Sequence, residues 1–387
     1  MVTSLIFPRI VKIGAGVRGE LPSIMEHLKI TRPLLVTDRP LVEHHVLDDI
    51  FALFEKNAIP YGIFDAVAPD PTTAHVDALR RVLAEGAYDG LVAVGGGSPM
   101  DTAKAAAILN SYAGKILREL KTPFAVGESL IPLVCLPTTA GTGAEMTRFA
   151  VITDVESNEK MLITGTGCVP AAALVDVELS MTMPRRVTAD TGLDALTHGV
   201  EAYLSHRHND HADVFAISGV KRVLENLPLV WQDPQNVAAR TQMMLAATHA
   251  GMAFSASSVA LVHGMSRAIG AFFHVPHGMA NAMLLKAVLR WTRPHAVDRL
   301  ASLAGNVGVA EAGMTDEAAA EALERRIAML VDSMSVPTPK QFGIDFAKWT
   351  EVIPTMTLQA LASGSPANNP GSPTDQDIRG LYAQVWN

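Results

Sequence analysis

The chain has 387 residues, 49% of them hydrophobic, and carries a formal net charge of −8. This length predicts two domains, and the apolar share supports a large core and argues against a disordered chain. Mild acidity without a basic cluster argues against nucleic acid as a partner. No apolar run reaches the roughly 18 residues that a membrane span needs. The first residues, MVTSLIFPRIVKIG, lack the apolar stretch of a secretory signal. Cys135 and Cys168 form no CxxC pair, so we expect reduced core cysteines in a cytoplasmic protein.

Short apolar runs alternate with helical patterns along the first half of the chain. Strands are expected at 32–38, 59–72, 90–98 and 130–139, and helices at 43–57 and 75–89. Strands separated by helices are typical of a parallel sheet that helices cover. The sequence therefore predicts an α/β domain in this half.

The composition changes near residue 180. Beyond it, Ala, Met and Leu dominate long helical patterns, which are expected at 190–205, 211–227, 235–254 and 256–271. Further helices continue to the C-terminus and are interrupted at 336–343 and at 363–374, the second a segment short enough to be an ordered loop. We expect an α/β domain over 1–180 and an all-α domain over 181–387.

A glycine turn follows the strand expected at 90–98. In GGGSPMDTAK, residues 95–104, Ser98 stands where a helix cap belongs and Pro99 where the first helical residue belongs. Glycines before a helix N-terminus let backbone N–H groups approach a phosphate, which the helix dipole also favours. The alternative is a tight strand-to-helix turn without a ligand. The segment matches neither a Walker loop nor GxGxxG.

Two other segments favour a dinucleotide at the same end of the sheet. PTTAGTGAEMT, residues 137–147, follows a strand and offers the hydroxyl groups of Thr138, Thr139 and Thr142. Asp38 ends the first predicted strand, where a carboxylate commonly holds the adenosine ribose and repels a 2′-phosphate. An ordinary turn aspartate is the alternative for Asp38.

The segment TADTGLDALTHGVEAYLS, residues 188–205, predicts a helix that Asp190 or Thr191 would cap. Asp194 and His198 are four residues apart and project from one face of this helix. A carboxylate and an imidazole at this spacing can bind one divalent ion. The alternative is a local hydrogen bond or ion pair between the two side chains.

Two more imidazoles come from LVHGMSRAIGAFFHVPHG, residues 261–278. His263 lies on a predicted helix, and His277 lies in a turn after Pro276. With Asp194 and His198 they complete a set that zinc, ferrous iron, manganese or nickel would accept. His274 is expected in a surrounding shell or a pocket wall. Four other histidines are interpreted as loop or core residues: His206, His208, His211 and His249.

Four blocks of the sequence resemble the signature blocks of the iron-containing (group III) alcohol dehydrogenases, in the same order and over nearly the whole chain. These blocks are GGGSPMDTAK, PTTAGTGAEMT, DALTHGVEAYLS and HGMSRAIGAFFHVPHG. The resemblance implies an N-terminal α/β dinucleotide-binding domain with a parallel sheet and an all-α C-terminal metal-binding domain, a dehydroquinate synthase-like fold. It implies NAD as cofactor and Fe²⁺, alternatively Zn²⁺, as the metal.

The resemblance also implies which residues bind the metal and the cofactor and which take part in catalysis. The implied metal ligands are Asp194, His198, His263 and His277. The implied cofactor contacts are Asp38, Gly95, Gly96, Gly97, Ser98, Asp101, Thr138, Thr139, Thr142, Lys160 and Leu179. Phe254 would lie near the nicotinamide, and Arg267, His274 and Phe254 are the expected catalytic residues.

One position departs from the family pattern. Many members carry a second histidine four residues after the first, assigned to proton transfer, and Arg267 stands there in this chain. Arginine stays protonated, so it cannot act as a general base at neutral pH. The proton would then leave through ribose hydroxyls and water, or through His274. Arg267 itself would bind a carboxylate or sulfonate of the substrate, or form a structural ion pair.

The resemblance predicts a metal-dependent, NAD-linked oxidoreductase (EC 1.1.1.-) that interconverts a small alcohol, in one variant an acidic one, with its aldehyde or ketone. A homodimer or larger homo-oligomer is expected, without nucleic acid or membrane as a partner. The alternatives are a related hydroxyacid, glycerol or maleylacetate-type dehydrogenase or reductase, a dehydroquinate synthase, and a non-catalytic dinucleotide- or metal-sensing protein.

Overall fold

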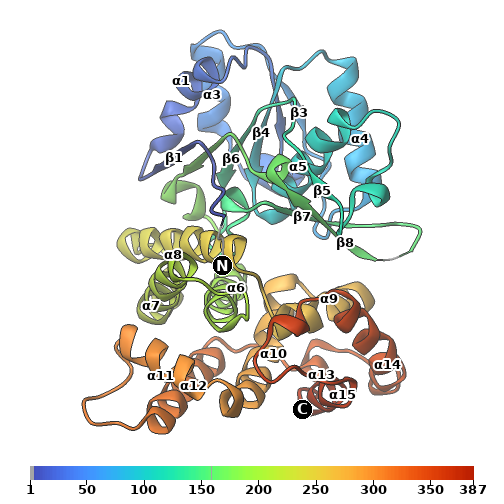
Figure 1. The fold of residues 1–387 in the computed structure, drawn as a ribbon. Coiled ribbons are helices and arrows are strands. Elements are labelled where there is room, and N and C mark those ends of the chain that lie inside the picture. The colour runs from blue at the N-terminus through green and yellow to red at the C-terminus, as the bar shows by residue number, and fades with distance from the viewer. Residues whose placement is uncertain (1–3, 158) are drawn as a thin grey trace. The chain divides into compact units, whose positions relative to one another are not determined.

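The computed structural model describes residues 4–157 and 159–387 and contains two compact units, Leu5–Met183 and Pro184–Asn387. The first unit combines strands and helices, whereas the described residues of the second form helices and no strand (Figure 1). Composition placed the domain boundary near residue 180, and the two units divide after Met183.

A six-stranded sheet with the order β1-β9-β6-β4-β2-β3 forms the centre of the first unit, and all neighbouring strands are parallel. The predicted parallel α/β fold is therefore confirmed. Its strands are β1 (Ile10–Ile13), β2 (Pro33–Val36), β3 (Gly62–Phe64), β4 (Gly90–Gly95), β6 (Leu133–Pro137) and β9 (Ala172–Val175).

Helices cover both faces of this sheet, which is why its central strands are apolar throughout. Leu34 and Val36 of β2 pack into a core with α4 and α5, while Leu35, between them, packs with α1 and α3. The helices and 3₁₀ turns of this unit are α1 (Leu21–His27), α2 (Arg39–Glu43), α3 (Asp48–Lys56), α4 (Thr73–Glu85), α5 (Gly97–Ser111), η1 (Val17–Glu20), η2 (Leu117–Leu120), η3 (Ala144–Met146), η4 (Thr166–Cys168) and η5 (Val177–Ser180).

A second, three-stranded sheet of β5 (Ala125–Val126), β8 (Lys160–Gly165) and β7 (Phe149–Thr153) was not expected from the sequence. Lys104 of α5 is fully buried and connects α5 to the segment that leads into β7. Its Nζ donates to the carbonyl oxygens of Ala144 at 2.7 Å and Phe149 at 2.8 Å. The loop between β6 and β7 is thereby held against α5. Cys135 and Cys168 are both buried and free.

Several predicted boundaries in this unit were wrong. The helix expected at 43–57 begins only at Asp48, as α3, while Glu43 ends a separate helix, α2; His45 between them has a left-handed backbone with φ of +61°. Asp38 does not end a strand: β2 ends at Val36, and Asp38 caps the N-terminus of α2. β2 is the second strand of the chain, since β1 precedes it.

Ten helices and two 3₁₀ turns make up the described residues of the second unit. They are α6 (Arg185–Leu204), α7 (Asp210–Gln232), α8 (Val237–Ala256), α9 (Leu261–Phe273), α10 (His277–Thr292), α11 (Val297–Asn306), α12 (Asp316–Ser333), α13 (Pro339–Phe342), α14 (Phe346–Ala362), α15 (Asp375–Gln384), η6 (Arg293–His295) and η7 (Pro366–Asn368). α6 is buried along most of its length. It begins at Arg185 and not near Asp190 or Thr191, so the expected caps lie inside the helix.

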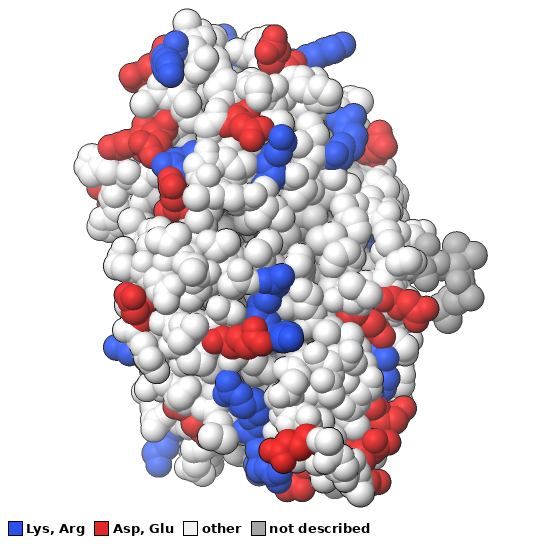
Figure 2. All heavy atoms as spheres, turned by 90° about the vertical axis from the view of Figure 1, so that its left-hand side faces the viewer, with Lys and Arg blue, Asp and Glu red and all other residues white. Residues whose placement is uncertain are grey.

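Among the described residues, no single helix has both the length and the apolar content that crossing a bilayer requires. Only α8 and α9 taken together, with a 105° bend at their junction, meet that criterion. On the face shown in Figure 2, basic and acidic side chains are interspersed and separated by uncharged surface.

Candidate functional site

Three helices of the second unit bring the four candidate metal ligands together. Asp194 and His198 come from α6, His263 from α9 and His277 from α10. One ligand atom from each lies within 4.8 Å of the other three. Ligands at about 2.0–2.2 Å from a common cation lie at most about 4.4 Å apart, so small side-chain shifts bring this set to coordination distance.

Asp194 is the centre of the cluster. Its Oδ1 lies 3.9 Å from Nδ1 of His198, 3.7 Å from Nε2 of His263 and 3.8 Å from Nε2 of His277. Burial by itself would raise the pKa of Asp194, but the three imidazoles outweigh this effect and hold that pKa well below its usual range. A carboxylate that stays ionised in a buried place, with imidazoles around it, suits a divalent cation.

His277 is the accessible member of the set. It is the first residue of α10, with Pro276 as N-cap, and so does not lie in a turn as expected. Its side chain is 37% exposed, against 2% for Asp194, and this leaves an open side from which a small molecule can approach. Gly278 makes the arrangement possible, because a Cβ there would lie 2.4 Å from the carbonyl oxygen of Asp190 on α6.

Glu201, which the sequence analysis missed, orients His263. Its Oε2 accepts a hydrogen bond from Nδ1 of His263 at 2.6 Å. The same carboxylate accepts the backbone N–H groups of Ala260 at 2.9 Å and Val262 at 2.5 Å, at the N-terminus of α9. An anion at a helix N-terminus is favourable, and a carboxylate on the far nitrogen fixes the tautomer of a ligating histidine. Glu201 lies three residues after His198 and seven after Asp194, and this helical spacing is the signal that could have revealed it.

Asn281, also missed, links three of the four candidate ligands. Its Nδ2 donates to Oδ1 of Asp194 at 2.7 Å and lies 3.1 Å from Nε2 of His263 and 3.3 Å from Nε2 of His277. Its Oδ1 is buried without a hydrogen-bond partner among the described residues. Asn281 follows His277 by four residues on α10, so the two share a helix face. A buried polar oxygen beside a set of metal donors indicates that the pocket is built for a polar occupant.

The ring of Phe254 on α8 stacks on His198, with centroids 4.2 Å apart and an interplanar angle of 15°. Phe254 therefore lies directly against a candidate ligand. His274 is exposed and ends α9 in a left-handed conformation with φ of +53°. Within the described chain, no hydrogen bond or ion pair joins His274 to the four ligands. Nδ1 of His249 lies 2.9 Å from Oγ of Ser218, away from this cluster.

Arg267 lies on α9, one turn after His263, and is partly buried. Its Nη1 donates to Oγ of Ser365 at 3.3 Å. Among the described residues no carboxylate lies within ion-pair distance of it, so the structural ion pair considered above is absent there. Burial lowers the pKa of Arg267 and Glu201 opposes this, but a guanidinium remains a cation at neutral pH.

In the first unit, the glycine turn leads from β4 into α5. α5 begins at Gly97 with Gly96 as its N-cap, so the prediction that Ser98 caps the helix was wrong. The helix starts earlier because Gly95 takes φ of +153°, a conformation that side chains rarely adopt. The N-cap, Gly96, has no side chain that could cap α5, and the first turn of the helix holds no acidic residue. Its amide groups and dipole are therefore available to an anion.

The threonine loop lies against this helix end. A Cβ at Gly97 would come within 3.1 Å of Thr142, and one at Gly96 within 3.4 Å of Thr139, so glycine permits the approach. The backbone N–H of Thr138 donates to the carbonyl oxygen of Gly95 at 2.9 Å. Oγ1 of Thr139 is buried without a hydrogen-bond partner among the described residues, as a hydroxyl reserved for a ligand would be.

The other expected cofactor residues have different surroundings. Asp38 follows β2, which runs parallel to β4, so it lies at the same sheet edge as the glycine turn; its Oδ1 accepts the N–H of Leu41 at 3.1 Å. Asp101 accepts the N–H of Val151 at 2.9 Å and so joins α5 to β7. Nζ of Lys160 pairs with Asp70 at 2.5 Å, and Leu179 is packed into the core with α1 and α3.

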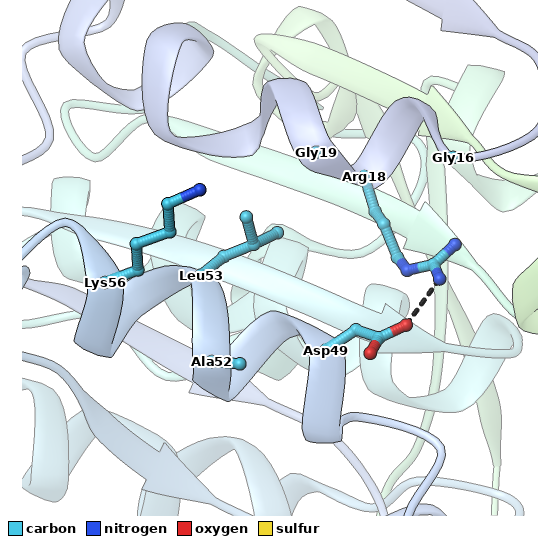
Figure 3. Close-up of a pocket in the computed structure, with 7 residues that line it drawn as sticks. All are labelled: Gly16, Arg18, Gly19, Asp49, Ala52, Leu53 and Lys56. Atoms are coloured by element: carbon cyan, nitrogen blue, oxygen red, sulfur yellow. Dashed lines mark hydrogen bonds and ion pairs between the residues drawn. The ribbon is translucent and has the colours of Figure 1, made fainter.

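Two surface hollows lie away from both residue sets. One lies between η1 and α3 and is lined by Gly16, Arg18, Gly19, Asp49, Ala52, Leu53 and Lys56 (Figure 3). The guanidinium of Arg18 in this hollow forms ion pairs with Asp49, Asp176 and Glu178. The other hollow includes residues of α10 and α12, among them Lys286 and Asp332. Neither is lined by a residue of the expected metal or cofactor sets.

Comparison with known proteins gives matches over both units. The family model described as "Iron-containing alcohol dehydrogenase" matches residues 8–177, and that described as "Fe-containing alcohol dehydrogenase family, C-terminal" matches residues 188–386. The NADPH-dependent butanol dehydrogenase of Clostridium saccharobutylicum is 30% identical over 383 residues, 98% of this chain and 97% of that protein.

Two solved structures share the fold over the whole chain. The crystal structure of 1,3-propanediol oxidoreductase has a TM-score of 0.94 and 29% identity, with 100% of both chains covered. The sulfoacetaldehyde reductase from Bifidobacterium kashiwanohense, in complex with NAD+, has a TM-score of 0.88 and 26% identity, with 100% of this chain and 99% of that chain covered.

Proposed function

Because the chain belongs to the family of iron-containing alcohol dehydrogenases, it is an oxidoreductase of alcohols and aldehydes, and we propose that it is a metal-dependent, NAD(H)-linked one that acts on a small alcohol. The observation that carries the proposal is the convergence of Asp194, His198, His263 and His277 within 4.8 Å. In this reaction the alcohol loses a hydride from carbon and a proton from oxygen, which gives an aldehyde or ketone, NADH and a proton.

The chain's own residues hold and orient the reacting groups. These four side chains would hold a divalent cation, which would polarise the substrate oxygen as a Lewis acid, and a bound nicotinamide would supply the hydride chemistry. Glu201 keeps the proton of His263 on Nδ1, so Nε2 presents its lone pair to the pocket. Phe254 fixes the plane of the His198 ring by stacking. The open side at His277 admits the substrate.

We propose Fe²⁺ as the metal and NAD as the cofactor. The family supports iron, although the same donors accept zinc. NAD is supported by Asp38 at the sheet edge, where a carboxylate would repel a 2′-phosphate, and by the NAD+ complex of the sulfoacetaldehyde reductase. A relative named as NADPH-dependent makes the direct comparison of the two cofactors necessary. The uncapped N-terminus of α5 would bind the pyrophosphate.

The test is a metal-dependent turnover assay. Protein purified without air is stripped with a chelator, reloaded with Fe²⁺ or Zn²⁺, and assayed on a panel of short alcohols with NAD+ and NADP+. Turnover is expected to disappear on stripping, to return on reloading, and to be absent from a His277→Ala variant. Full turnover by stripped protein would overturn the proposal. Size-exclusion chromatography with light scattering would test the homodimer that we propose as the assembly.

A further inference from the structure

We infer that Arg267 is a specificity-determining residue, and that the preferred substrate is a short aldehyde or alcohol bearing a carboxylate or sulfonate, which Arg267 binds through its guanidinium while the carbonyl or hydroxyl end lies at the Asp194 cluster. This inference rests on the proposed function and names the substrate class of the same site. Four observations carry it.

The first observation is position. Arg267 follows His263 by four residues on α9, so both side chains project from one face of the helix, with Cβ atoms about 5–6 Å apart. Nε2 of His263 belongs to the candidate metal cluster. A group held by the guanidinium is therefore within the length of a small molecule from the atoms that would hold the reacting oxygen.

The second observation is that the charge of Arg267 has no carboxylate to neutralise it. Three partly buried arginines have one: Arg18 pairs with Asp176 at 2.9 Å, Arg299 with Asp213 at 2.9 Å and Arg293 with Glu324 at 2.6 Å. Arg222 and Arg240 also lack a carboxylate partner among the described residues, but each bonds through two of its nitrogens to uncharged groups of the protein. Arg267 has no such partner within the described part of the chain. Partial burial of a cation is costly unless an anion compensates it.

The third observation concerns the donors of the guanidinium. Of its five N–H groups, one is used on Ser365, at 3.3 Å, and the others bond to no described residue. Nε and Nη2 are not fully enclosed by protein atoms. Two parallel N–H groups of an arginine match the two oxygens of a carboxylate or sulfonate.

The fourth observation is that the loop carrying Ser365, which bonds to Arg267, is fixed against α9. Gly264, one turn before Arg267, lets the chain at Pro366 pack directly on α9, because a Cβ there would lie 2.7 Å from that proline ring. Nδ2 of Asn368 donates to Oγ of Ser258 and to the carbonyl oxygen of Val259, both at 3.0 Å. The loop that carries Ser365 is thus fixed, and Ser365 holds one end of the guanidinium in place. A site prepared in advance loses less entropy on binding.

The experiment compares substrates matched in length and differing in charge. Reduction of succinic semialdehyde is compared with that of butanal, and of glyoxylate with acetaldehyde, for wild type, Arg267→Gln, Arg267→Lys and Arg222→Gln. Arg222 is the matched control, because it lies in the same unit, bonds to a serine hydroxyl and has no carboxylate partner among the described residues. We expect wild type to prefer the charged member of each pair.

For Arg267→Gln we expect kcat/KM on succinic semialdehyde to fall about tenfold or more, mainly through KM, and kcat/KM on butanal to fall by a clearly smaller factor. Arg267→Lys keeps the charge but not the paired donors, so an intermediate loss is expected. Arg222→Gln should leave kcat/KM unchanged for both succinic semialdehyde and butanal. Equal losses on both aldehydes in Arg267→Gln, or a wild type that prefers butanal, would overturn the inference.

A binding measurement separates this inference from the proposed function. Ligand-observed NMR on chelator-stripped protein is expected to detect propionate but not propanamide, and Arg267→Gln should abolish the propionate signal. Absence of turnover on all four aldehydes with either cofactor would contradict the proposed function, while propionate binding that depends on Arg267 would still support an anion site. Propionate binding that the Arg267→Gln variant retains would overturn the inference even in an active enzyme.

Discussion

Glu201 and His263 share a hydrogen bond of 2.6 Å between Oε2 and Nδ1, and the same carboxylate caps the helix that carries His263. One side chain on α6 therefore sets both the position of α9 and the tautomer of its candidate ligand. The dependence of α9 on Glu201 makes this residue a positioning residue, and not a catalytic one.

A Glu201→Gln variant is expected to bind Fe²⁺ or Zn²⁺ about 10–100-fold more weakly, because an amide cannot supply the negative charge that makes His263 a strong donor. Titration of stripped protein followed by metal analysis measures the change. Glu324→Gln is the control, since Glu324 is also a buried glutamate of this unit but pairs with Arg290 and Arg293. Equal affinity in the Glu201→Gln variant and wild type would contradict the assigned role.

Gly278→Ala is expected to destabilise the protein by about 1–3 kcal/mol, because its Cβ would meet the backbone oxygen of Asp190 at 2.4 Å and push α10 from α6. The metal affinity should fall as well, since His277 is the neighbouring residue. Gly305→Ala is the matched control: apart from its chain neighbours and the nearby backbone of α11, no atom lies within 4 Å of its Cβ position, so it should be neutral or stabilising by up to about 1 kcal/mol. Urea unfolding measures the change in the free energy of unfolding for both variants. Equal changes in Gly278→Ala and Gly305→Ala would contradict the close contact at Gly278.

Asp38→Asn separates two roles of one side chain. Asparagine still caps α2 by accepting from the N–H of Leu41, so stability should hardly change. Loss of the negative charge should lower the preference for NAD over NADP by about tenfold, which corresponds to about 1.4 kcal/mol. The ratio of kcat/KM for the two cofactors is the measurement. An unchanged ratio would mean that Asp38 only caps the helix.

Asp154 makes stability depend on pH. Burial would raise its pKa, but hydrogen bonds from Ser157 at 2.6 Å and Arg118 at 3.0 Å outweigh burial and lower the pKa to about 2 from the ordinary 3.8. Since the folded value is the lower one, this carboxylate stabilises the fold fully above the unfolded value and progressively less as the pH falls through about 2.

An Asp154→Asn variant should therefore be less stable than wild type at pH 7, and the gap should narrow as the pH falls below about 4. Urea unfolding from pH 7 to pH 3 follows the gap. Asp77→Asn is the control, because that exposed carboxylate lies 4.0 Å from its nearest arginine. A gap that is constant over this pH range would show that the charge of Asp154 does not stabilise the fold.

The sequence could reveal the parallel sheet and the pairing of Asp194 with His198 because both depend on local pattern. Buried parallel strands are continuous apolar runs, and a helix places Asp194 and His198 on one face without tertiary information. Their meeting with His263 and His277 followed from a resemblance between whole signature blocks, and not from spacing.

What could not be predicted depends on contacts between distant segments. Ser98 looked like a helix cap, yet the left-handed backbone at Gly95 starts α5 two positions earlier than such a cap would. β1 pairs with β9, which is far away in sequence, so its short run gave no signal by itself. Ser365 and Arg267 are 98 positions apart, and only folding shows that they touch.

The amide of Asn281 contacts three of the four candidate ligands, from helices α6, α9 and α10. The side chain of Asn281 therefore joins these three helices through contacts between protein atoms alone. We therefore expect α6, α9 and α10 to keep their positions whether or not a cation is bound at the candidate ligands.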